Sequence, residues 1–207
     1  MTNGDHESAT RASGWMQEGS GWDWIDEDYP IAFTLMFVRA VTPERLIEAF
    51  GADPAAAELL TAEATGLTLG YPWVRAGCAD EWAFAFDNSS VKFSELRRIA
   101  RELSAGTDLA LLDSGPNMDY FYYLIDGTEV TSFEPLLAFD RDGSDPDRFV
   151  PQMRQAGLSV DRGRDRARQQ RSPRVAVLEM LTLALGIRLP REVAMGPLLT
   201  VEPGPPA

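Results

Sequence analysis

The side chains that could do chemistry in this 207-residue chain are mainly carboxylates, because it contains one histidine, His6, and one cysteine, Cys78. A Ser-His-Asp triad or a Cys-His pair needs a positioned imidazole, and His6 lies in a polar N-terminal stretch that is typical of a mobile terminus. The same counts exclude zinc sites of four Cys and His ligands and internal disulfide bonds. We therefore predict no catalytic residue, no metal site and no cofactor.

Two further features suggest chemistry but have simpler explanations. Cys78 lies near the end of a predicted strand, and we interpret it as a small packed hydrophobic residue rather than a nucleophile. The acidic stretch 140–147 resembles a calcium loop, but an EF-hand needs glycine at position 6 and an acid at position 12. Those positions hold Asp145 and Pro151, so we predict a turn followed by a helix start.

The strongest candidate for a partner-binding surface combines two tryptophans with four acidic residues. Tryptophans are common anchors of protein interfaces, and carboxylates around them would steer a basic partner. The structural alternative is that the tryptophans pack on a sheet while the acids face water. The residues of this candidate patch are Trp22, Asp23, Trp24, Asp26, Glu27 and Asp28.

The net charge of −13 argues against nucleic acid as a ligand, because phosphates would be repelled. The same charge permits fast, salt-sensitive association with a basic protein. The aromatic run 120–123 could stack bases, but strand propensity alone explains it. The arginines of residues 161–174 could contact an acidic group, and we interpret this segment as an exposed, solvated loop.

The elements that must position these residues begin with clear helix signals. Thr42 followed by Pro43 predicts an N-cap and a helix that ends at Gly51. Asp53-Pro54 predicts a second helix, through about residue 64, with Leu59 and Leu60 directed inward. Further helices are predicted over 94–103, from 145 to about 156, over 174–186 and over 190–195. The segment 174–186 is apolar almost all round, so we expect it to be central.

Strand patterns are interspersed with the helices. The run 31–38 fits a buried strand or a helix start, two strands are expected within 73–87, and another covers 109–112. The best local signal is a hairpin over 118–132, in which Asp126-Gly127 suits a type I′ turn. This turn pairs Ile125 with Thr128 and Tyr123 with Val130. We predict an α+β fold, an antiparallel sheet of about five strands with flanking helices and one central apolar helix.

The predicted organisation is a disordered tail over 1–20, a single α+β domain over 21–200 with the exposed Arg-rich loop 161–174, and a tail over 201–207. The N-terminus lacks the charged and apolar regions of a signal peptide. No stretch reaches about 18 uninterrupted apolar residues, so we expect no membrane association. We therefore expect a cytoplasmic protein in which Cys78 is a reduced thiol.

Several caps, turns and core strands, taken together in order and spacing, form a recognisable set. They lie in the segments 37–44, 50–52, 81–84, 103–107, 121–127, 133–135 and 185–190. With this set the chain resembles, over about residues 22–200, a family of uncharacterised actinobacterial proteins classed as a domain of unknown function. The resemblance implies a bacterial cytoplasmic protein, and it implies no activity and no catalytic residues.

The function that these observations favour is non-catalytic binding by an acidic protein-interaction module, as in regulators or immunity proteins that bind a basic partner. The first alternative is a carboxylate-based enzyme, which requires a concave pocket lined by two or more acids with raised pKa values. The second alternative is a small-molecule sensor that uses the Trp and Tyr faces of the sheet, which predicts an apolar pocket.

Overall fold

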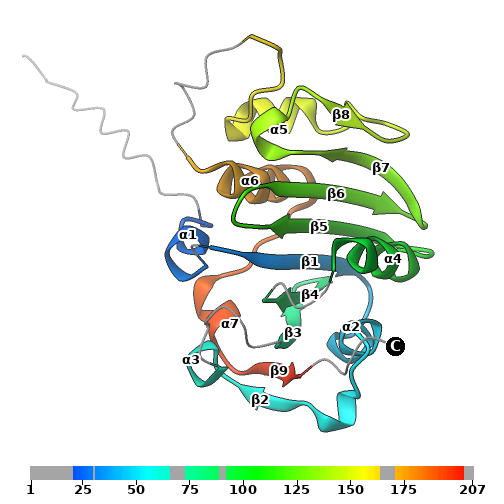
Figure 1. Cartoon of the computed structure of the whole chain (residues 1–207), viewed down its shortest axis with the longest axis vertical. Coiled ribbons are helices and arrows are strands. Elements are labelled where there is room, and N and C mark those ends of the chain that lie inside the picture. Colours follow the sequence, from blue (N-terminus) through cyan, green and yellow to red (C-terminus); the bar gives the residue numbers. More distant parts are fainter. Residues whose placement is uncertain (1–20, 30, 66–72, 89–91, 164–170, 203–207) are drawn as a thin grey trace, which may run out of the picture.

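The computed structural model describes residues 21–202 apart from 30, 66–72, 89–91 and 164–170. The predicted tail 1–20, residues 203–207 and most of the Arg-rich loop therefore lie outside the described residues. Within them, nine strands form one sheet in the order β2-β9-β3-β4-β1-β5-β6-β7-β8 (Figure 1). The strands are β1 Phe33–Arg39, β2 Glu58–Leu60, β3 Val74–Ala79, β4 Trp82–Asp87, β5 Asp108–Ser114, β6 Asp119–Ile125, β7 Thr128–Phe133, β8 Arg141–Asp142 and β9 Leu198–Val201.

The α+β class and the antiparallel sheet are confirmed, since every neighbouring pair of strands is antiparallel. The prediction of about five strands is wrong. Strands β2, β8 and β9 have 3, 2 and 4 residues, and strands this short carry too few residues to show an alternation in the sequence.

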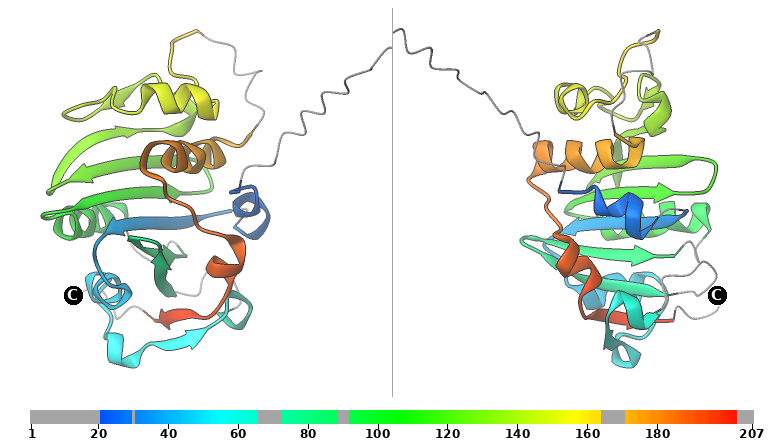
Figure 2. Two further views of the ribbon diagram at one scale, coloured as in Figure 1. Left: turned by 180° about the vertical axis from the view of Figure 1, so that it is seen from behind. Right: turned by 90° about the vertical axis from the view of Figure 1, so that its left-hand side faces the viewer.

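Helices cover both faces of the sheet (Figure 2). One apolar core contains buried residues of α1, α5, α6 and α7, and the other contains buried residues of α2 and α4. None of the helices in the described parts of the chain is long and apolar enough to cross a lipid bilayer. The helices are α1 Trp24–Asp28, α2 Pro43–Ala49, α3 Ala62–Thr65, α4 Phe93–Leu103, α5 Val150–Ala156, α6 Pro173–Leu185 and α7 Arg191–Met195, with 3-10 turns η1 Pro54–Ala56 and η2 Pro135–Leu137.

The prediction of one central apolar helix is not matched. The apolar segment is α6, which lies on the same side of the sheet as α7 in Figure 2 and packs against α5 and the sheet. Contacts with both a sheet and a neighbouring helix explain why this helix is apolar on most of its surface. It is one of several helices on that face.

The region between α2 and α3 differs most from its prediction. The start of α2 is confirmed, because Thr42 Oγ1 accepts a 3.3 Å hydrogen bond from the amide of Arg45. The predicted helix after Asp53 is wrong: Asp53 caps only the turn η1, and the chain then forms β2 and α3. Leu59 pairs with Leu199 of β9 at the outer edge of the sheet and is 68% exposed rather than inward.

The hairpin of β6 and β7 has the predicted turn. Asp126 and Gly127 both have positive φ angles, 47° and 72°, and Ile125 pairs with Thr128 as expected. The predicted pair of Tyr123 with Val130 is wrong, because a bulge shifts the register and pairs Tyr123 with Thr131. The carbonyl oxygen of Val130 instead accepts a 2.8 Å hydrogen bond from the amide of Asp145, just after β8.

Candidate functional site

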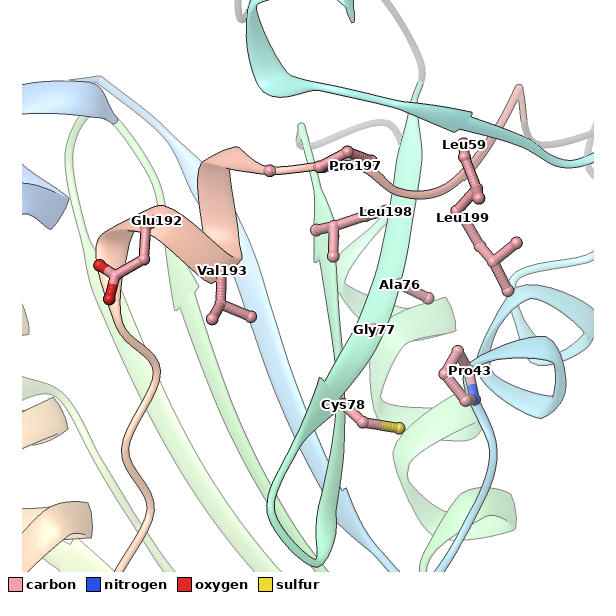
Figure 3. Close-up of a pocket in the computed structure, with 11 residues that line it drawn as sticks. Pro43, Leu59, Ala76, Gly77, Cys78, Glu192, Val193, Pro197, Leu198 and Leu199 are labelled. Carbon is pink, nitrogen blue, oxygen red and sulfur yellow. The ribbon is translucent and has the colours of Figure 1, made fainter.

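A groove of about 360 Å³ opens beside β3, where the pairing of β3 with the N-terminal end of β9 stops (Figure 3). Strand β3 pairs with β4 along its whole length, but β9 covers only the half of β3 from Val74 to Ala76. The uncovered half of β3 forms the floor of this edge groove. Its defining residues are Pro43 at the start of α2, Cys78 on β3, Val193 on α7, Pro197, and Leu59 and Leu199 on β2 and β9.

The sequence explains why β9 covers only half of β3. The register pairs Ala76 with Leu199, and its continuation places Pro197 opposite Cys78. Proline has no N–H to donate, so the ladder ends there. Gly196 lets the chain turn tightly as it leaves α7, because a Cβ at this position would lie 2.8 Å from the carbonyl oxygen of Glu192.

A buried arginine fixes the wall of the edge groove to its floor. Arg75 of β3 is 2% exposed and points to the sheet face opposite Cys78. Its guanidinium donates to the carbonyl oxygens of Ala194 at 3.0 Å and Gly196 at 2.9 Å, where α7 ends. It also donates to the carbonyl oxygen of Leu60 in β2 at 3.3 Å. One side chain therefore holds β3, β2 and the end of α7 together.

Tyr29, which follows α1, extends this buried cluster. Its ring stacks on Phe86 with the ring centroids 5.0 Å apart. Burial raises the pKa of the Tyr29 hydroxyl, and the positive charge of Arg75 partly opposes that rise. Burial also lowers the pKa of Arg75 from its ordinary value, but a guanidinium keeps its proton in proteins. The cluster is thus a neutral phenol beside a buried cation, which is suited to holding structure.

The edge groove is apolar and has an acidic margin. Two large apolar side chains remain exposed on it, Leu59 at 68% and Val193 at 36%. Among the described residues that line it, Glu192 is the one charged side chain. Glu44 on α2 lies close enough to Cys78 for its charge to affect the thiol. Exposed apolar surface with acids at its margin is one feature of protein-binding sites.

Cys78 is exposed in this groove, so the expectation of a packed side chain is wrong. Its position explains the difference, because it lies on the half of β3 that β9 does not cover. Partial burial raises the pKa of the Cys78 thiol, and the negative charge of Glu44 raises it further. Because the reactive form is the thiolate, this environment disfavours a nucleophilic role.

The tryptophans of the predicted patch lie inside the protein. Trp22 is 2% exposed, and its indole N–H donates a 2.8 Å hydrogen bond to Thr182 of α6. Trp24 is 6% exposed and meets Phe86 edge to face, with the ring centroids 6.3 Å apart. These side chains help to fasten α1 to the core, so a partner cannot use them as anchors while α1 stays in place.

Two of the four acids of the patch are also engaged within the protein. Asp26 lies 3.0 Å from the guanidinium of Arg174, at the start of α6. Asp28 accepts two hydrogen bonds from Arg191, at 2.7 and 2.9 Å, at the start of α7. Asp23 and Glu27 are exposed, and they are the part of the patch that a partner can reach.

One carboxyl group elsewhere has a clearly altered environment. Burial raises the pKa of Asp113 on β5, and the negative charge of Asp119 adds to the rise. Thr34 of β1 donates a 2.8 Å hydrogen bond to Asp113, which opposes it. Among the described residues, no group of three or more His, Cys, Asp or Glu side chains could hold a metal ion. Asp113 is therefore a partly buried acid on the sheet, and it does not line the edge groove.

Sequence reasoning missed the edge groove because its residues come from four separate segments. The sequence pattern predicts Leu59 on the inward face of a helix, and it predicts a packed side chain for Cys78. The local signal that marks the groove is Gly196-Pro197 directly before the strand residues Leu198 and Leu199, since this pair ends a ladder. The signal shows where a strand stops, but it does not show which strand is left uncovered.

A protein-family model matches most of the chain. A model of DUF6461, described as a family of unknown function, matches residues 8–194. The chain belongs to DUF6461. The match confirms the resemblance to a domain of unknown function. Among the described elements, the DUF6461 match includes everything from α1 to Ala194 in α7. A search of curated proteins and a search of solved structures found no match to this chain.

Proposed function

We propose that this DUF6461 protein is a non-catalytic interaction module that binds a basic protein in the bacterial cytoplasm, as regulators and immunity proteins do. The observation that carries the proposal is the edge groove, in which Val193 stays exposed next to Glu192 and Leu59 stays exposed on the other side of β3. The net charge of −13 adds long-range attraction for a basic partner.

The size of the groove sets its role in such a complex. A stable protein interface takes on the order of 20–30 residues from each partner, and 11 described residues line the groove, so the groove can supply only part of such an interface. Binding energy is concentrated in a few apolar anchors, and charges at the margin mainly accelerate association. We therefore assign the groove as the anchor site and the acidic surface around it, including the exposed Asp23 and Glu27, as the steering part.

The two alternatives have weaker support. A carboxylate enzyme needs paired acids in a concave site, and the described lining of the groove contains only Glu192, while Asp113 lies elsewhere. A small-molecule sensor fits the volume of the groove, which falls in the range of ligand pockets. However, the described lining includes no tryptophan or tyrosine, and it has few polar groups that converge on one ligand.

Affinity capture from a lysate of the native host, with matched variants, tests the proposal. Leu59→Gln and Val193→Gln make the groove polar without touching the buried core. Leu136→Gln is the matched control, because Leu136 is a 42% exposed apolar residue outside the groove. All variants are captured at low and at high salt, and their folding is checked by thermal melting.

The expected result is a basic protein held in stoichiometric amount by the native chain and by Leu136→Gln, but lost from both groove variants. High salt should also release it, because attraction between opposite charges is screened. Equal capture by all variants would remove the groove from the proposal. Capture of no protein by any variant would favour the small-molecule alternative, which a thermal-shift screen with metabolites would then address.

A further inference from the structure

We infer that the partner enters the edge groove as an extended strand that pairs with the free edge of β3 at Cys78, in line with β9. This inference rests on the proposed function and specifies how the partner is recognised. Addition of a strand to an open sheet edge is a general mode of peptide binding, in which main-chain hydrogen bonds give affinity and alternate side chains give specificity.

The backbone of Cys78 is directed to the open side of the sheet. The carbonyl oxygen of Glu81, in the turn before β4, accepts from the amide of Ala40 next to β1. Because main-chain groups alternate along an antiparallel ladder, Trp82 is directed the other way, to its partner Ala79 on β3. The N–H and C=O of Cys78 then point away from β4, towards the edge that β9 leaves open.

Among the described residues, no strand pairs with this side of β3 beyond Ala76. Continued by two residues, the register of β9 would reach Pro197, which cannot donate a hydrogen bond, and Gly196 joins it to the end of α7. Figure 3 shows Val193 on one side of β3 and Pro43 on the other, with Cys78 between them. A strand laid on this edge would direct alternate side chains to these two walls.

The chemistry of the walls defines the kind of segment that fits. Val193 and Pro43 offer apolar contacts to two side chains of opposite direction, and the groove has room for a few residues. Glu192 and Glu44 lie at its margins, so basic residues that flank the apolar ones are favoured. The expected occupant is an extended segment of a basic protein in which apolar and basic residues are interspersed.

A second copy of this chain fits the same edge poorly. Each copy has a net charge of −13, so two copies repel one another. The outermost strand, β2, presents only the 3 residues from Glu58 to Leu60, and short edge strands resist pairing between copies. The charge of the molecule therefore points to a different, basic protein.

Selection of a displayed random-peptide library on the whole protein provides a defined probe. Peptides that are enriched at low salt are synthesised, and their affinities are measured by fluorescence anisotropy for the native chain and for Val193→Gln. Each peptide is also made with single N-methyl groups along its backbone. In an added strand every second N–H faces the sheet and the others face away from it. Methyl groups at the outward positions are therefore the matched control for methyl groups at the inward positions.

Two variants of Cys78 test the hydrogen bond that its N–H would donate to the added strand. Cys78→Pro removes the outward N–H, a change that edge positions of a sheet accept, whereas Cys78→Ala keeps the N–H and removes only the thiol. The expected result is a loss of about tenfold or more for Cys78→Pro and for one set of alternate N-methyl positions. The Cys78→Ala variant should bind the unmodified peptide with nearly native affinity. Peptides methylated at the other set of positions should bind the native chain with nearly the affinity of the unmodified peptide.

The outcomes separate this inference from the proposed function. If peptides bind in a way that depends on Val193 but N-methylation at either set of positions has no effect, the groove binds partners and strand addition is wrong. If the affinity of no enriched peptide depends on Val193, both the proposed function of the groove and the inference of strand addition are wrong. If Cys78→Pro does not fold, the N-methyl series on the native chain decides the question alone.

Discussion

The guanidinium of Arg75 donates a 2.9 Å hydrogen bond to the carbonyl oxygen of Gly196, and this contact joins the floor of the edge groove to its wall. The floor is an uncovered half-strand, and the wall is the end of a short helix. The groove is thus a fixed feature of the fold, which lowers the entropy cost of binding a partner there.

Replacement of Arg75 by methionine should destabilise the protein by about 2–4 kcal/mol, because it leaves carbonyl oxygens of β2 and α7 without donors. Arg75→Lys should lose most of the same energy, since one ammonium cannot match a planar guanidinium. Chemical denaturation measures the change. Arg45→Met is the control and should change stability by less than about 0.5 kcal/mol, because Arg45 is a surface residue with an exposed ion pair to Glu48. Equal stability of Arg75→Met and the native chain would contradict this role.

The turn between β6 and β7 gives a second test. Gly127 has a φ of 72°, and a β-branched residue there should destabilise the protein by at least about 1–2 kcal/mol. Gly127→Val should therefore lower the melting temperature. Gly21→Val is the matched control, because an added Cβ at Gly21 meets no atom within 4 Å. An unchanged melting temperature for Gly127→Val would show that the turn does not depend on glycine.

The partly buried acid Asp113 predicts a pH dependence of stability. Because its pKa is raised from 3.8 in the folded protein, ionisation of Asp113 weakens the fold as the pH rises through that raised value. Asp113→Asn stays neutral and keeps an oxygen to accept from Thr34. It should raise the free energy of unfolding at pH 7, and the gain should disappear as the pH falls below 3.8.

Urea denaturation of Asp113→Asn across this pH range checks the sign. Asp140→Asn is the control, since Asp140 is exposed, and it should not reproduce the profile. A variant that is less stable than the native chain at pH 7, or a gain that grows towards acid, would show that the charged form of Asp113 is the one the fold favours.

Elements with strong local signals could be predicted from the sequence. The cap at Thr42 and the turn at Asp126-Gly127 depend on residues close in the chain, and both are confirmed. The bulge in β7 could not be predicted, because the carbonyl oxygen of Val130 accepts a hydrogen bond from the amide of Asp145, fifteen positions later in the chain. Local sequence patterns reflect interactions between residues that are close in the chain. The register of paired strands depends on the whole assembled sheet, so these patterns do not predict it.

The candidate site illustrates the same limit. The Trp-Asp patch was chosen from composition, which cannot distinguish a surface anchor from a core residue; Trp22 is buried because α6 and the sheet cover it. The edge groove depends on where β9 stops relative to β3, and that relation joins residues about 120 positions apart, such as Arg75 and Gly196. No local pattern near Cys78 records that its strand is half uncovered.

The thiol of Cys78 provides a direct probe of the groove. Since burial and then Glu44 raise its pKa, alkylation by iodoacetamide at neutral pH should be slower than for the urea-unfolded chain. Glu44→Gln should lower the pKa and speed the reaction, whereas Glu48→Gln on the same helix should not. Equal rates for the folded and unfolded chains would contradict this account of the thiol.

The same reaction tests the central claim most directly, because Cys78 is the one cysteine of the chain. The measurement is the alkylation rate of Cys78 in the free protein and in the complex with the basic protein that it captures. Occupation of the edge groove predicts that the complex reacts several-fold more slowly, and that high salt restores the free rate. An unchanged rate in an intact complex would contradict the account, because the partner would then bind elsewhere on the acidic surface.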